Sequence, residues 1–135
     1  MSSTYVSKPR NGKLTFGPVW DFDLSMGALN SLTPGWPSEG WHINNPALWT
    51  FSDVGKWLPR VFQDPALKAQ VKARWQALAP ALLNVVDSIP TTGAAIDPAR
   101  DTDAARWRNY PHDPDLDPTL QSWLRRRINW MGANL

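Results

Sequence analysis

The chain contains no cysteine, only two histidines and no apolar run long enough to cross a membrane. The lack of cysteine excludes disulfide bonds and thiolate metal sites. His42 and His112 stand far apart in the sequence, without metal-ligand spacing to one another or to an acidic cluster, so we expect neither to be catalytic. We expect no membrane span, and no signal-like hydrophobic region lies at the N-terminus. The compartment is left open.

Tryptophan and proline are abundant, with nine and thirteen copies in 135 residues. This length predicts one domain or subdomain, large enough to bury a core. Each tryptophan brings a large apolar area with specific packing, so the core need not be rich in aliphatic side chains.

The formal net charge is +2, and the basic residues gather in residues 68–74 and 125–127. A cluster of three arginines is also found in nucleic-acid-binding proteins. Such runs more often form a solvated helix face or pair with acids, here Asp113, Asp115 and Asp117. We therefore expect no nucleic-acid partner.

Four Asp-Pro steps divide the C-terminal part of the chain. Aspartate at an N-cap accepts an orphan amide bond, and the fixed φ of proline suits the first helical turn. The steps are Asp64-Pro65, Asp97-Pro98, Asp113-Pro114 and Asp117-Pro118. Together with apolar residues spaced three and four apart, they predict several short helices. The predicted helices cover residues 55–62, 65–79, 79–88, 98–109 and 118–131, with a break at 90–93.

Two aspartates, Asp21 and Asp23, follow a predicted strand over residues 13–20. In an extended segment, side chains two residues apart share a face with Cβ atoms about 7 Å apart. Asp21 and Asp23 are therefore candidate ligands of one cation. The alternative is a solvated turn or a cap of the next segment.

The segment over residues 17–27 reads Gly-Pro-Val-Trp-Asp-Phe-Asp-Leu-Ser-Met-Gly. It resembles the metal-binding segment of the CotH kinase family, atypical protein kinases named after spore coat protein H. The segments that resemble the family's helices are residues 57–67, 71–78, 104–109 and 123–131. The resemblance covers residues 8–135 and is weakest over 89–103.

The resemblance implies a mainly α (α+β) fold, a C-lobe-like helical subdomain of a kinase-like fold. A short N-terminal strand or hairpin would carry the Asp-Phe-Asp segment. The expected parts are residues 8–27 with the strand and metal-binding segment, a loop rich in Trp, Pro and Gly over 28–51, and a helical subdomain over 52–135. We expect the strand either to pair with residues near 4–7 or to lie at the edge of the helical core.

The resemblance also implies transfer of the γ-phosphoryl group of ATP to a serine hydroxyl of a protein substrate, with Mg²⁺ and ATP as cofactors. Asp21 would be the principal magnesium ligand and Asp23 an auxiliary one. No residue of this chain is assigned as catalytic. In the family, the basic phosphate clamp and the catalytic aspartate precede the metal segment. Because only twenty residues precede Asp21, we expect the chain to be the C-terminal part of such a domain, partnered by an N-terminal lobe and inactive alone.

Three tryptophans, Trp36, Trp41 and Trp49, lie in the irregular loop after the acidic pair. They are candidates for substrate contact, but tryptophan in such a loop more often pins it onto neighbouring helices. Exposed tryptophans also stack on sugars, so a carbohydrate-binding or surface-attachment module is an alternative function. A purely structural helical subdomain is another.

Overall fold

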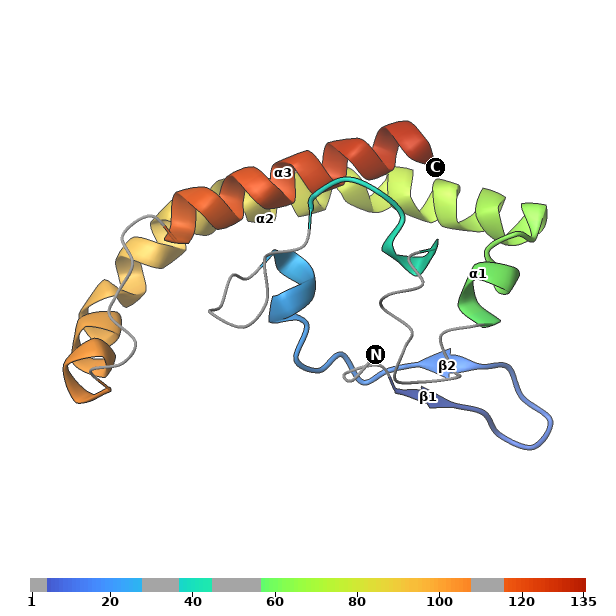
Figure 1. Cartoon of the computed structure of the whole chain (residues 1–135), viewed down its shortest axis with the longest axis horizontal. Coiled ribbons are helices and arrows are strands. Elements are labelled where there is room, and N and C mark those ends of the chain that lie inside the picture. The colour runs from blue at the N-terminus through green and yellow to red at the C-terminus, as the bar shows by residue number, and fades with distance from the viewer. Residues whose placement is uncertain (1–4, 28–36, 45–56, 108–115) are drawn as a thin grey trace. The chain divides into compact units, whose positions relative to one another are not determined.

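The computed structural model describes residues 5–27, 37–44, 57–107 and 116–135. These residues are mainly helical, as predicted (Figure 1). The elements are β1 (Val6–Ser7), β2 (Thr15–Phe16), the 3-10 helices η1 (Asp23–Met26) and η2 (His42–Asn44), α1 (Trp57–Val61), α2 (Pro65–Arg106) and α3 (Leu116–Asn134). The chain forms two compact units, Met1–Val71 and Lys72–Leu135.

In the first unit, β1 and β2 form a two-stranded antiparallel hairpin. Val6 lies opposite Phe16, and the backbone N–H of Gly17 donates to the carbonyl oxygen of Tyr5 at 3.0 Å. The predicted pairing with residues near 4–7 is confirmed, but the strand is shorter than residues 13–20. Gly17 has a positive φ of 138° and Pro18 has no N–H, so the ladder cannot continue beyond this point.

The short helix α1 places Pro59 in its first turn, where a missing N–H costs no helical bond. Phe62, which follows α1, contacts the ring of Trp41 with centroids 5.2 Å apart. Of the three loop tryptophans, Trp41 therefore packs against an aromatic side chain beside a helix. Trp36 and Trp49 lie outside the described residues.

The start of α2 follows the prediction from Asp64-Pro65. Oδ1 of Asp64 accepts hydrogen bonds from the backbone N–H of Ala66 at 2.7 Å and of Leu67 at 3.3 Å. The cap satisfies two amides that have no partner within the helix. α3 begins at Leu116, within two residues of the predicted start at Pro118, while Asp113-Pro114 lies outside the described residues.

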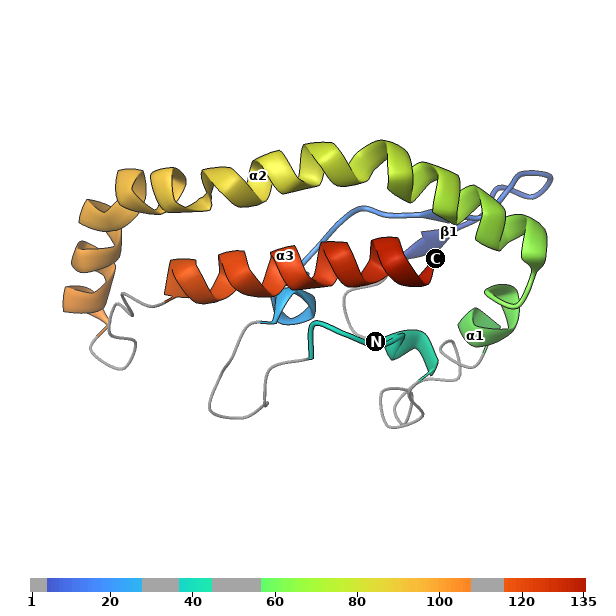
Figure 2. The same cartoon turned by 90° about the horizontal axis from the view of Figure 1, so that it is seen from above.

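The predicted breaks after Pro65 are wrong, because α2 continues through Pro80, Pro90 and Pro98 to Arg106. Asp97 does not start a new helix; its Oδ1 pairs with Nη1 of Arg100 at 3.2 Å. A proline inside a helix removes one hydrogen bond and bends the axis, and it ends the helix only when nothing else stabilises the following turns. Figure 2 shows the resulting curvature of α2.

In the second unit, α2 and α3 pack side by side in antiparallel directions, as both views show. Nζ of Lys72 donates to the carbonyl oxygen of Leu135 at 2.7 Å, and a Cβ atom at Gly132 would lie 3.8 Å from Nε1 of Trp75. Further along, Nε2 of Gln121 donates to a carbonyl oxygen of α2 at 3.1 Å. The most buried apolar residues of this pair are Val86, Trp123 and Ile128, at 2%, 9% and 7% exposure.

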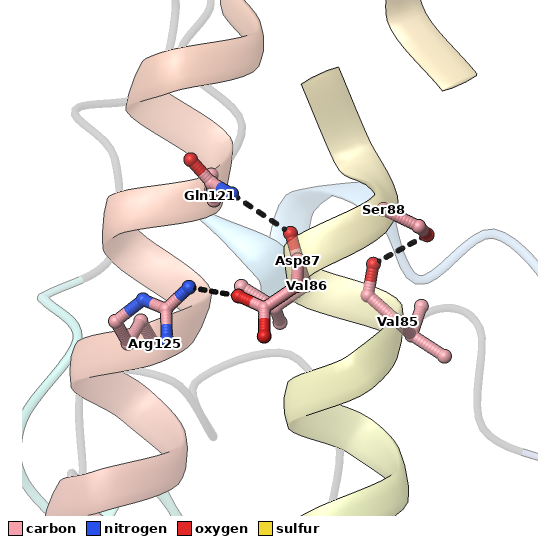
Figure 3. Close-up of polar contacts among 6 residues, drawn as sticks. All are labelled: Val85, Val86, Asp87, Ser88, Gln121 and Arg125. Atoms are coloured by element: carbon pink, nitrogen blue, oxygen red, sulfur yellow. Dashed lines mark hydrogen bonds and ion pairs between the residues drawn. The ribbon is translucent and has the colours of Figure 1, made fainter. Parts of the chain in front are cut away.

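Two arginines of α3 have described partners. Arg125 pairs with Asp87 on α2 (Figure 3). The guanidinium of Arg127 lies 5.3 Å from the ring centroid of Trp130, and burial lowers the pKa of Arg127. Trp107 is 56% exposed, and the guanidinium of Arg106 lies 5.5 Å from its ring centroid. The side chains of Asp113, Asp115 and Asp117 lie outside the described part.

None of the helices described is both long and apolar enough to cross a membrane.

Candidate metal-binding segment

The acidic pair lies in a turn, not in an extended segment. Asp21 has a positive φ of 56°, Phe22 has φ −98° and ψ 8°, and Asp23 is the first residue of η1. The extended geometry predicted from the spacing of Asp21 and Asp23 is therefore wrong. For Asp21 and Asp23 to share one cation, the turn must bring their carboxylates together, since the two-residue period of a strand does not apply here.

The backbone of Asp21 is unusual for a residue with a side chain. Positive φ occurs in a few per cent of non-glycine residues, and aspartate is among those that tolerate it best. Such a conformation costs about 1–3 kcal/mol and is concentrated at functional sites. Asp21 is exposed.

Ser25 and Gly27 build the turn that follows the acidic pair. Both the backbone N–H and the Oγ hydroxyl of Ser25 donate to the carbonyl oxygen of Phe22, at 3.0 and 2.6 Å. Gly27 ends η1 in the left-handed conformation with φ 82°, which glycine adopts without steric cost. Sequence reasoning gave Ser25 and Gly27 no role of their own beyond membership of the family segment. The sequence feature that could have indicated one is a serine and a glycine that closely follow two aspartates.

The side chains around Asp21 are strongly exposed and apolar. Val19 is 85% exposed and Trp20 is 63% exposed, while Phe22 is half-buried. Asp21 thus follows two exposed apolar residues in the sequence.

The donor chemistry of the segment fits a hard divalent cation. Mg²⁺ prefers oxygen ligands, keeps several waters and is usually held by one or two carboxylates beside substrate phosphates. Among the residues that the structure describes, no group of three or more His, Cys, Asp or Glu side chains could hold a metal ion. An acidic pair of this kind suits a metal shared with a phosphate ligand better than a metal held by protein alone.

Of the two histidines, His42 is the first residue of η2. A ring nitrogen of His42 lies 3.0 Å from the carbonyl oxygen of Pro37, and His112 lies outside the described residues. The contact to Pro37 holds η2 locally, which is a structural role.

The family comparison agrees with the resemblance carried by residues 17–27. A family model described as CotH kinase protein matches residues 1–131. The chain belongs to the CotH kinase family. No curated protein and no solved structure matches this CotH family chain.

Proposed function

We propose that this chain is part of an Mg-ATP-dependent protein kinase that phosphorylates serine hydroxyls of a protein substrate. It would supply the metal-binding segment and a helical part equivalent to a kinase C-lobe, with the N-terminal lobe as its structural partner. The observation that carries the proposal is the family match over residues 1–131. The oxygen donors of Asp21 and Asp23, set in a turn, support it.

In this proposal, Asp21 is the principal ligand of Mg²⁺ and Asp23 is an auxiliary ligand, direct or through water. When bound, the metal stabilises the charge of the β and γ phosphates, which is a major part of catalysis in phosphoryl transfer. Asp21 contributes a full negative charge toward that metal. Half-buried Phe22 holds the backbone between the two carboxylates.

The alternative of a carbohydrate-binding or other non-catalytic module gains no support from the described residues. Trp41, one of its candidate sugar platforms, packs against Phe62. The strands described are the two short ones of the hairpin, whereas a sandwich-type sugar binder needs many. Loss of transfer in the experiment below would distinguish a kinase from a structural module.

The test is the substitution Asp21→Asn in the protein that carries this chain, assayed with γ-labelled ATP, Mg²⁺ and a serine-rich protein. Asparagine keeps the shape and removes the charge, so we expect transfer to fall by about a hundredfold or more. Asp23→Asn should be less harmful. Asp103→Asn, at an exposed aspartate of α2, is the matched control and should leave transfer unchanged. Wild-type turnover by Asp21→Asn would refute the metal assignment.

A further inference from the structure

The side chain of Ser25 forms a hydrogen bond within the turn that carries the acidic pair. Its Oγ hydroxyl donates to the carbonyl oxygen of Phe22 at 2.6 Å, in addition to the 3.0 Å bond from its own backbone N–H. A carbonyl oxygen has two lone pairs, so both bonds can form at once. The acceptor, Phe22, is the residue between Asp21 and Asp23.

We propose that Ser25 is a positioning residue for the metal-binding carboxylates, an inference that rests on the proposed function of Asp21 and Asp23. Ser25 does not itself need to contact the metal. It holds the peptide plane that joins Phe22 to Asp23, and this plane sets the direction in which the chain enters Asp23 from the residue that follows Asp21.

The physical need for such a residue follows from the length of η1. A 3-10 helix of four residues has few internal hydrogen bonds and poorer bond geometry than an α-helix. No side-chain cap stabilises its start, since Phe22 at the N-cap has no polar group. The hydroxyl of Ser25 adds a second bond where the backbone alone provides one.

The conformation of Asp21 makes this bond more important. Its positive φ is strained, and a strained residue keeps its conformation only when the surrounding structure determines it. Gly27 closes η1 on the other side at no steric cost. Without the Ser25 hydroxyl, the turn could relax, and two carboxylates would be held less closely in the arrangement that a cation requires.

The experiment is a titration of the purified 135-residue chain with Mn²⁺, followed by the electron paramagnetic resonance signal of the free ion. We expect Ser25→Ala to weaken Mn²⁺ binding about three- to tenfold, the effect of losing one orienting hydrogen bond. Ser25→Thr keeps the hydroxyl and should restore wild-type affinity. Hydrogen exchange over residues 22–27 should quicken in Ser25→Ala and not in Ser25→Thr.

Ser88 offers a matched control on α2. Its Oγ hydroxyl donates to the carbonyl oxygen of Val85 at 2.8 Å, the same three-residue bond in a different place (Figure 3). Ser88→Ala should leave Mn²⁺ affinity unchanged. Equal affinities of Ser25→Ala and wild type would overturn the positioning role, and so would an equal loss in Ser88→Ala.

The same titration separates this inference from the proposed function. If Asp21→Asn weakens Mn²⁺ binding and Ser25→Ala does not, the positioning role fails and the metal assignment stands. If Asp21→Asn has no effect on Mn²⁺ binding, the metal assignment is wrong, and the positioning role that rests on it is overturned as well. A wild-type chain that binds no Mn²⁺ at millimolar concentration would overturn the positioning role, and the phosphoryl-transfer assay would still decide the proposed function.

Discussion

Gln121 on α3 supplies a hydrogen bond that the carbonyl oxygen of Val86 on α2 cannot receive from its own helix. In an α-helix, this carbonyl accepts from the N–H four residues later. That residue is Pro90, which has no N–H. Nε2 of Gln121 donates to the same oxygen at 3.1 Å instead (Figure 3). The interhelical bond therefore repairs the defect that Pro90 introduces into α2.

This repair predicts an energetic coupling between Gln121 and Pro90. We expect Gln121→Leu to lower the free energy of unfolding by about 1–2 kcal/mol, because it leaves a buried carbonyl without a donor. In a Pro90→Ala background, the new N–H of residue 90 can bond Val86, so Gln121→Leu should cost much less. Urea unfolding of the four proteins in this double-mutant cycle measures the coupling.

Gln70→Leu, at an exposed glutamine of α2, is the control for a change from an amide to an apolar side chain. It should shift stability by less than about 0.5 kcal/mol. Equal costs of Gln121→Leu with and without Pro90 would show that the two residues act independently.

The N-cap of α2 predicts a second stability effect. Asp64→Ala removes the acceptor of the amides of Ala66 and Leu67, and it should cost about 1 kcal/mol. Asp64→Asn keeps an acceptor oxygen and should cost less. Thermal unfolding followed by circular dichroism should show a decrease of a few degrees for Asp64→Ala. An unchanged midpoint would mean that the cap does not contribute to stability.

We also expect the 135-residue chain by itself to show no phosphoryl transfer and to bind magnesium only weakly. Asp21 and Asp23 can attract a cation, but the transfer also needs a basic clamp on ATP and a catalytic aspartate for the acceptor hydroxyl. Members of a catalytic unit act non-additively, so a chain that contains neither of these groups should show no activity above background. The measurement compares the chain with a longer protein that includes these parts, using labelled ATP. Robust transfer by the short chain would show that the active site lies elsewhere.

Local sequence signals predicted those features that depend on a few neighbouring residues. The start of α2 is one, because the carboxylate of Asp64 and the fixed φ of Pro65 act within a single turn. The pairing of residues 6–7 with 15–16 is another, since a hairpin with residues near 4–7 was one of the two expected arrangements of the strand. The family segment that contains Asp21 and Asp23 could also be found from residue order alone.

Tertiary structure decided whether the same signals act elsewhere. Asp97-Pro98 repeats the Asp64-Pro65 signal, yet it lies inside α2, since a local cap cannot interrupt a helix that is already formed on both sides. Pro90 leaves α2 intact because the missing donor comes from Gln121, thirty-one residues further along the chain. Asp21 takes a positive φ, which the two-residue period of a strand could not predict. The order of residues determines which side chains can cap a helix, bend it or bind a ligand. Contacts between distant segments decide which of these local structures form, because they supply hydrogen bonds and buried area that a short segment lacks.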